Sequence, residues 1–160
     1  MTKTLVLLRH GEAASTVPGY RDYDRNLTKT GCEQAKKVSS FLAGFSLPPL
    51  YAYVSSACRT QETYGYLSVN LVHNTLSSKR LYEGTVEDVR ELLLDTPDAE
   101  QAVLVVGHNP TISWFAELLT QQPLEFHPSG CAVLECDGNS WADVVYDCWT
   151  LKGVNSSVGS

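Results

Sequence analysis

Two short apolar runs constrain the fold of this chain more than any other feature. Residues 5–8 (Leu-Val-Leu-Leu) and residues 102–106 (Ala-Val-Leu-Val-Val) contain no polar side chain. Short runs of this composition are typical of strands that are buried on both faces of a sheet. Such strands occur mainly in parallel sheets that carry helices on both sides, so the two runs favour this architecture.

The segments between and beyond these runs alternate between strand and helix patterns. Further strands are predicted at residues 50–54, 69–73, 132–135 and 143–146. Helices are predicted from Thr28 or Thr30 to about residue 45, and at residues 59–66, 85–94 and 111–119. This order predicts an α/β fold, a single three-layer domain with a mostly parallel sheet and helices on both faces. We expect the domain to span residues 1–151, and the Gly- and Ser-containing segment 152–160 to be a disordered tail.

Length, charge and cysteine content narrow the functional classes. A chain of 160 residues with 43% hydrophobic residues is long enough for one domain with a real core. The formal net charge of −6 argues against nucleic-acid partners, which require a basic surface. The apolar run near the N-terminus is far shorter than a signal sequence or a membrane span. Five cysteines without a C-x-x-C pair favour free thiols, and therefore a cytoplasmic protein without a membrane partner.

Three polar clusters follow predicted strands directly. They are Arg9-His10-Gly11, the segment 55–63 (Ser-Ser-Ala-Cys-Arg-Thr-Gln-Glu-Thr), and Gly107-His108-Asn109-Pro110. Each has an ordinary structural interpretation, such as a helix cap, a solvated cation or a buried core histidine. However, open α/β sheets bind ligands at the carboxyl ends of their strands, and all three clusters lie at such ends. The sequence therefore predicts one shared site at this edge.

The residue types in the clusters suit an anionic substrate. An imidazole can attack an electrophile or relay a proton, and a guanidinium holds oxygen atoms with a planar fork of donors. Phosphoryl transfer needs mainly this positioning and charge stabilisation, because charge spreads over three equatorial oxygens. The pattern contains neither the cysteine and arginine spacing of cysteine phosphatases nor the paired histidines of a zinc site, so we expect no metal and no cofactor.

These motifs resemble the histidine phosphatase superfamily, whose fold is phosphoglycerate-mutase-like. The signature Arg-His-Gly stands at residues 9–11, and the supporting motifs are Leu27-Thr28-x-x-Gly31-x-x-Gln34-Ala35, Ser55-Ser56-x-x-x-Arg59-Thr60-x-x-Thr63 and Gly107-His108-Asn109. The short length and the Gly-His-Asn-Pro sequence are most similar to the small bacterial phosphohistidine phosphatases, the SixA-type group. Mutases of the superfamily are considerably longer.

The resemblance implies a role for each matching residue. His10 would be the nucleophile that accepts the phosphoryl group, and Arg9, Arg59 and His108 would surround the phosphate oxygens. Arg25 matches an arginine of the small branch that also reaches the phosphate. The general acid stays open between Glu83 and Asp22 or Asp24, because Asn109 stands where a secreted branch carries an aspartate. Asp22 and Asp24 could instead simply hold Arg25.

We therefore expect a metal-independent phosphatase that forms a phosphohistidine intermediate on His10. Its expected partner is a protein that carries phosphohistidine, or alternatively a small phosphate ester. A further alternative is a non-catalytic module that binds a phosphorylated ligand. The expected walls of the site are residues 13–25, the Pro48-Pro49 region and residues 121–130.

Overall fold

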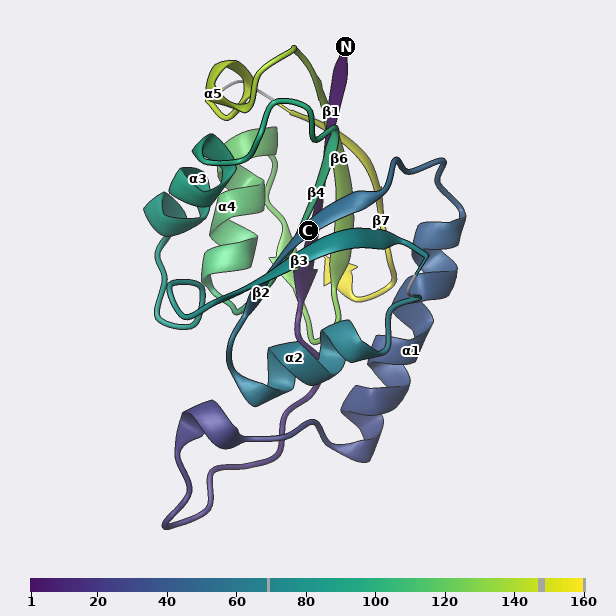
Figure 1. Ribbon diagram of the computed structural model, residues 1–160. Coiled ribbons are helices and arrows are strands. Elements are labelled where there is room, and N and C mark those ends of the chain that lie inside the picture. The colour runs from purple at the N-terminus through teal and green to yellow at the C-terminus, as the bar shows by residue number, and fades with distance from the viewer. Residues whose placement is uncertain (69, 147–148, 160) are drawn as a thin grey trace.

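A six-stranded sheet with the strand order β3-β2-β4-β1-β6-β7 forms the middle of the computed structural model (Figure 1). The structure describes residues 1–68, 70–146 and 149–159. The strands are β1 (Thr2–Arg9), β2 (Leu50–Ser55), β3 (Val72–Ser78), β4 (Ala102–Gly107), β6 (Cys131–Asp137) and β7 (Thr150–Val154). A separate antiparallel pair joins β5 (Glu125–Phe126) to β8 (Val158–Gly159).

The sheet is mostly parallel, as predicted. Strands β3, β2, β4 and β1 pair in parallel, β6 is antiparallel to β1, and β7 is antiparallel to β6. Strand β7 therefore points in the same direction as β1, and β6 alone opposes the other strands of this sheet. The carboxyl ends of β1, β2 and β4 consequently lie at one edge.

Helices cover both faces of the sheet (Figure 1). They are α1 (Lys29–Ala43), α2 (Cys58–Gly65), α3 (Val86–Leu94), α4 (Thr111–Thr120) and α5 (Trp141–Val144), with a 3-10 turn η1 (Asp22–Asp24). Helices α1 and α2 pack on one face of the sheet, and α3, α4 and α5 pack on the other. The α/β fold with three layers is thus confirmed.

The continuous apolar run of β1 follows from this sandwich. Successive strand residues point to opposite faces, and residues 5–8 of β1 are completely buried on both. Leu5 and Leu7 belong to the core under α3 and α4, whereas Val6 and Leu8 belong to the core under α1 and α2. A polar residue at any of these positions would be buried without a partner.

Two predicted strands are placed differently in the structure. The strand expected at 69–73 lies instead at Val72–Ser78, and residue 69 is outside the described residues. Because β3 is an edge strand, its side chains are mostly exposed and polar, and no apolar run indicates it. The segment 143–146, predicted as a strand, begins in helix α5. Ser140 caps that helix by accepting a hydrogen bond from the Ala142 N–H, and Trp141 stacks on Trp149.

The expectation of a disordered tail from residue 152 is wrong for residues 152–159. Strand β7 extends to Val154, and β8 pairs with β5. Asn155 fixes the turn between them, because its Nδ2 donates to the Ser129 carbonyl and its Oδ1 accepts from the Cys131 N–H. Residue 160 lies outside the described residues.

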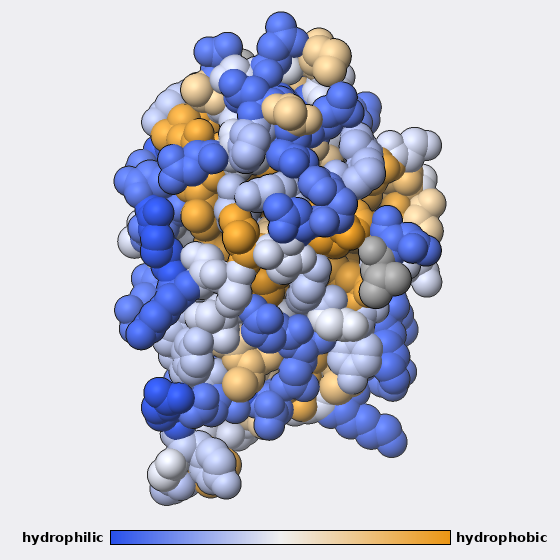
Figure 2. Space-filling view, in the orientation of Figure 1, coloured by the Kyte–Doolittle hydropathy of each residue, from blue (hydrophilic) through white to orange (hydrophobic). Residues whose placement is uncertain are grey.

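The segment between β1 and α1 projects from the carboxyl edge of the sheet, at the lower end of Figure 1. In the space-filling view of the same face, this end carries mostly blue and pale side chains, as a solvated loop should (Figure 2). Among the described residues, no helix is long and apolar enough to cross a membrane.

Two glycines hold the base of this projecting segment against α1. A Cβ atom at Gly11 would lie 2.6 Å from the Gly31 carbonyl oxygen, and one at Gly31 would overlap the Glu12 carbonyl oxygen. The space is this small because the Thr28 N–H donates to the Glu12 carbonyl at 2.9 Å. Thr28 is also the N-cap of α1, with its side chain accepting from the Gly31 N–H.

We predict that Gly31→Ala lowers the free energy of unfolding by about 2 kcal/mol or more, because backbone atoms must move to admit the methyl group. The matched control is Gly65→Ala at the end of α2, where a Cβ meets nothing within 4 Å. That change should stay within about 1 kcal/mol of the wild type. Urea unfolding of both variants checks the prediction, and equal stabilities would contradict it.

Candidate active site

The parallel pairing of β1 with β4 brings the first and third polar clusters together. Arg9 is in register with Gly107, and the His10 N–H donates to the Gly107 carbonyl at 3.2 Å. Strand β2 lies on the other side of β4 and ends at Ser55, at the same edge. The three clusters that the sequence predicted to share a site therefore do so.

His10 is buried, with 8% of its surface exposed, and its hydrogen bond defines its tautomer. Its Nδ1 lies 2.6 Å from the Gly11 carbonyl oxygen. A carbonyl only accepts, so Nδ1 carries the proton and Nε2 keeps its lone pair. Thr63 holds the loop in place, because its Oγ1 accepts from the Gly11 N–H at 3.0 Å and its hydroxyl donates to the Arg59 carbonyl at 2.7 Å.

Burial keeps His10 neutral. The pKa of His10 is lowered to about 4. Desolvation is the largest cause, the Gly11 carbonyl opposes it, and the charges of Arg59, Arg9 and Arg25 also lower the pKa. At neutral pH His10 Nε2 is therefore unprotonated.

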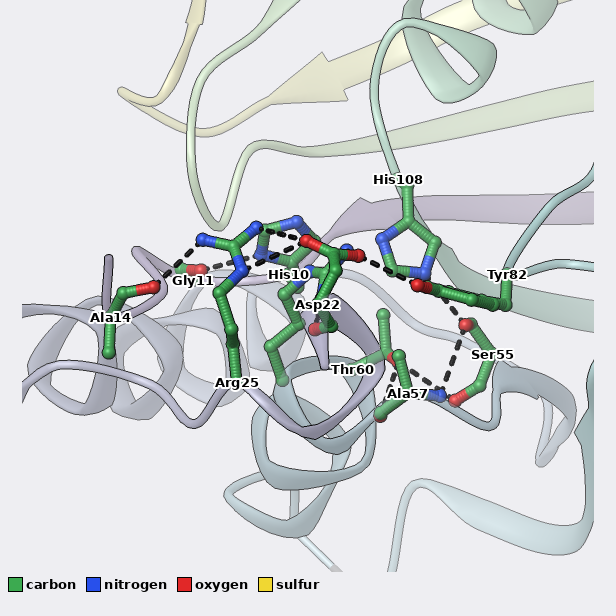
Figure 3. A network of polar contacts seen from close by, with 11 residues as sticks. His10, Gly11, Ala14, Asp22, Arg25, Ser55, Ala57, Thr60, Tyr82 and His108 are labelled. Atoms are coloured by element: carbon green, nitrogen blue, oxygen red, sulfur yellow. Dashed lines mark hydrogen bonds and ion pairs between the residues drawn. The ribbon is translucent and has the colours of Figure 1, made fainter. Parts of the chain in front are cut away.

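His108 faces His10, with ring centroids 5.2 Å apart and the rings tilted by 58°. Its Nε2 lies 2.7 Å from Ser55 Oγ (Figure 3). Ser55 Oγ also accepts from the Ala57 N–H at 3.4 Å, so this hydroxyl connects the imidazole to the start of α2. His108 Nδ1 is buried and has no hydrogen-bond partner among the described residues. Burial lowers the pKa of His108 to about 3, so it too is neutral.

Arg9 and Arg59 are each anchored through the ends of their guanidinium groups. Arg9 Nη1 donates to the Phe126 carbonyl at 2.8 Å, and Arg59 donates from Nη1 and Nη2 to the backbone and side chain of Asp22. The Nε atoms of both arginines are buried without a partner in the described part of the chain. The charges of Arg9 and Arg59 act on His10, and the His108 ring faces it, so two buried N–H donors and the buried His108 Nδ1 are unused on residues that flank His10. Unpaired buried donors are costly, and an anion with several oxygens would satisfy them.

The Asp22 carboxylate connects the arginines to the projecting segment. Its Oδ1 accepts from Arg25 Nε at 3.0 Å, and its Oδ2 accepts from Arg59 Nη2 at 3.1 Å and the Tyr82 hydroxyl at 2.8 Å (Figure 3). The Tyr82 hydrogen bond, followed by Arg59 and Arg25, lowers the pKa of Asp22 to about 2. Asp22 is therefore ionised at neutral pH and holds no proton to donate.

The other acid candidates are placed less centrally. Glu83 is exposed and forms no hydrogen bond or ion pair within the described residues, although it lines a cavity of about 460 Å³ beside Asp22 and Tyr82. Asp24 pairs with the exposed Arg21 at 2.8 Å. The role of Glu83 as general acid stays a prediction.

Asn109 is part of the scaffold. Its Nδ2 donates to the Phe126 carbonyl at 2.8 Å, the same oxygen that Arg9 uses. Its Oδ1 accepts from the N–H and the hydroxyl of Ser113 in the first turn of α4. The position that carries an acid in a related branch therefore braces α4 against the 121–130 segment.

Sequence reasoning missed Tyr82 as a site residue. Its ring is edge-on to His108 at 5.7 Å, and the Arg59 guanidinium lies 5.9 Å from the ring centroid. No sequence pattern marks it, because its loop follows β3 and reaches the site only when β3 pairs with β2 and β2 pairs with β4. No sequence pattern indicates the positive φ of 59° at Ser129 either. The Ser129 N–H donates to the His10 carbonyl at 2.9 Å.

One predicted wall is at the wrong end. Pro48 and Pro49 directly precede β2, so they lie at the amino ends of the parallel strands, opposite the site. In contrast, the 13–25 and 121–130 segments both contribute contacts to the arginines. Within residues 1–68, 70–146 and 149–159, no three His, Cys, Asp or Glu side chains gather closely enough to hold a metal ion.

The fold and this cluster of two histidines and three arginines define a class of protein. A sequence profile of the histidine phosphatase superfamily (branch 1) matches residues 5–95, more than half of the chain. The chain belongs to this superfamily. The resemblance of the Arg-His-Gly motif is thereby confirmed.

Individual relatives place the chain near the small branch. An uncharacterized chloroplastic protein of Arabidopsis thaliana is 28% identical over 96% of this chain and 78% of its own length. Two solved structures are assigned as the phosphohistidine phosphatase SixA. The one from Nakamurella multipartitia has 31% identity and a TM-score of 0.82, covering 98% of this chain and 97% of that chain. The one from Agrobacterium tumefaciens has 26% identity and a TM-score of 0.81, covering 96% and 98%. The structure is thus SixA-like.

The lowered pKa values of His10 and His108 predict a pH dependence of stability. A free imidazole has a pKa of about 6.5, so unfolding takes up protons between about pH 6.5 and pH 4. The stability contributed by each neutral histidine is therefore complete above about pH 6.5 and is lost as the pH falls through this window. The lowered pKa of Asp22 acts only at lower pH, as the carboxylate is protonated toward pH 2.

Denaturant unfolding at pH 7 and pH 5 measures this effect. Between pH 7 and pH 5, we expect the free energy of unfolding to fall less for His10→Gln than for the wild type, because the variant lacks an imidazole that takes up a proton on unfolding. Parallel losses in both proteins would show that His10 is not held neutral.

Proposed function

We propose that this protein is a metal-independent phosphatase that acts on phosphohistidine in a protein, through a covalent phosphohistidine intermediate on His10. The membership of the superfamily and the SixA-like structure support phosphatase activity. The observation that carries the finer proposal is the neutral His10, whose Nε2 lone pair is available beside the buried Nε donors of Arg9 and Arg59 and the buried His108 Nδ1, none of which has a partner among the described residues. A location in the cytoplasm belongs to the same proposal.

In the first step, His10 Nε2 attacks phosphorus while the bond to the leaving group breaks in line. The charge on the three equatorial oxygens would be met by the Nε groups of Arg9 and Arg59 and by His108 Nδ1. The positive charge that develops on His10 is stabilised because Nδ1–H donates to the Gly11 carbonyl. In the second step, water attacks the phosphohistidine and regenerates His10 with release of phosphate.

The proton donors available at the site indicate which leaving group the reaction suits. Asp22 is ionised, residue 109 is an amide, and Glu83 forms no hydrogen bond or ion pair with any described residue. An alkoxide must receive a proton as it leaves, whereas the imidazole of phosphohistidine can already carry its own. The site is thus better suited to phosphohistidine than to alkyl phosphates. The cavity of about 460 Å³ that Tyr23, Tyr82 and Glu83 line offers space for the rest of the substrate.

One alternative is a small-molecule phosphomonoesterase on the same scaffold. The observation that favours it is the position of Glu83 in the wall of this cavity, from which a carboxylic acid could reach an ester oxygen. A non-catalytic binding module is less consistent with the site, because binding phosphate does not require a neutral histidine with a free lone pair.

The first prediction concerns the intermediate. Rapid quenching during turnover of an aryl phosphate should trap an acid-labile, base-stable phosphoryl group on His10. His10→Ala should lose nearly all turnover but remain folded, and phosphopeptide mapping identifies the labelled residue. The assays contain EDTA, because Arg9, Arg25 and Arg59 would neutralise the phosphoryl group without a metal ion.

Two results would contradict the proposal. A phosphoryl group trapped on His108 instead of His10 would overturn the assignment of the nucleophile. Loss of activity in EDTA that one divalent ion restores would overturn the metal-independent mechanism.

A competition among substrates tests the substrate class. We expect a phosphohistidine peptide and activated aryl phosphates to be hydrolysed at least tenfold faster than sugar phosphates by kcat/KM, because no proton donor is positioned for an alkoxide. The variant Glu83→Gln tests whether Glu83 acts as a general acid. It should leave phosphohistidine hydrolysis within about threefold of the wild type. Faster turnover of sugar phosphates by the wild type would favour the phosphomonoesterase instead.

A further inference from the structure

The Asp22 carboxylate joins three separate parts of the chain at the site (Figure 3). Both of its oxygens are engaged: Oδ1 by Arg25 of the projecting segment, and Oδ2 by Arg59 of α2 and Tyr82 of the loop before α3. The Asp22 backbone carbonyl accepts a further bond from Arg59 Nη1 at 2.8 Å. The Asp22 side chain thus contacts Arg25 and Arg59, the two arginines of the site that do not belong to β1.

We propose that Asp22 is a positioning residue for the reaction, which holds Arg25 and Arg59 in the orientation that binds the phosphoryl group. This inference rests on the proposed function of the site. The sequence also left Asp22, in the segment Asp22-Tyr23-Asp24-Arg25, as a candidate proton donor. The positioning role is different from proton donation.

The geometry of Arg59 supports this role. A guanidinium is planar and rigid, so fixing two of its nitrogens fixes the direction of the third. Asp22 binds both Nη1 and Nη2 of Arg59, and the remaining Nε is the buried donor without a described partner. Since Arg59 is only 6% exposed, water cannot replace these contacts freely. Asp22 therefore determines which edge of Arg59 remains for a phosphate oxygen.

Arg25 is held in the same way. Its Nε and Nη2 bind Asp22 Oδ1 at 3.0 and 2.9 Å, and its Nη1 donates to the Ala14 carbonyl at 2.8 Å. The backbone and the carboxylate together place this long side chain beside His10, where its charge contributes to the lowered pKa of the imidazole. Without Asp22, Arg25 would keep a single anchor on a solvated loop.

The same contacts argue against proton donation by Asp22. Protonation would replace an acceptor with a donor at an oxygen that Arg59, Arg25 or Tyr82 already occupies. The Tyr82 hydroxyl donates its proton to Asp22, so it is not directed at a leaving group either. Three charge-assisted or hydroxyl hydrogen bonds would have to be rearranged before this carboxyl could act as an acid.

Asp24 provides a matched control. It lies in the same turn η1 and carries the same charge, but its side chain pairs with Arg21, whose own side chain is 76% exposed. Asp22→Asn and Asp24→Asn therefore remove one negative charge from almost the same place, while only the first alters contacts with Arg25 and Arg59.

The test measures kcat and KM for a series of aryl phosphates with different leaving-group pKa values, together with a phosphohistidine peptide. For Asp22→Asn we expect kcat to fall about tenfold or more, by the same factor for every leaving group, because misplaced donors affect the phosphoryl group and not the departing atom. Asp24→Asn should stay within about twofold of the wild type. Thermal unfolding confirms that each variant is folded.

Two outcomes would overturn the positioning role. A loss that grows with the pKa of the leaving group would identify Asp22 as the proton donor, and activity of Asp22→Asn equal to that of Asp24→Asn would show that it does not act in the reaction. In a background with both Arg25→Ala and Arg59→Ala, Asp22→Asn should cost less than threefold, since it acts through these two arginines; the full tenfold loss there would also contradict the proposal.

Failure of the proposed function gives a different result. If the wild-type protein forms no phosphoenzyme and hydrolyses none of these substrates, the phosphatase proposal and the positioning role both fail. If the wild type turns over through His10 but the two aspartate variants behave alike, only the role of Asp22 is lost.

Discussion

The parallel pairing of β1 with β4, in one register, is the constraint on which the site depends. Arg9 lies opposite Gly107, so the two histidines follow the last paired residues of neighbouring strands and their rings meet at 5.2 Å. A slip of one residue would turn every side chain of β1 to the other face of the sheet. Because residues 3–8 of β1 are buried on both faces, their packing holds the register that brings His10 and His108 together.

The site has a rigid part and an attached part. The rigid part comes from the ends of β1, β2 and β4, where Ser55 and Thr63 fix the two imidazole-bearing segments. The attached part is the projecting segment, which the close approach of Gly11 and Gly31 anchors at its base. Asp22 connects the two parts at the outer end, so the segment adds Arg25 to a framework that already holds Arg9 and Arg59.

Electrostatics at the site differ from those of the whole protein. The chain carries a formal charge of −6, which repels an anionic substrate at long range. Locally, three arginines surround two histidines that burial keeps neutral, and the ionised Asp22 carboxylate offsets part of the positive charge. In the proposed function, a phosphoryl group would meet a cationic pocket at short range, where low solvent exposure strengthens each contact.

The sequence by itself determined the features that arise from local pattern and composition. The apolar runs of β1 and β4, the helix predicted at residues 85–94, and the motifs around His10, Arg59 and His108 each lie in a few neighbouring residues, so they could be recognised without the fold. The choice between Thr28 and Thr30 as the start of α1 needed the structure. Tertiary structure decided what depends on contacts between distant segments. The exposed edge strand β3 exists because β2 pairs with it, and α5 and the ordered residues after 152 are stabilised by packing and side-chain hydrogen bonds across the chain. The neutral state of the histidines and the three contacts of Asp22 also require the folded chain, because burial and geometry shift the pKa of a group only once its neighbours are in place.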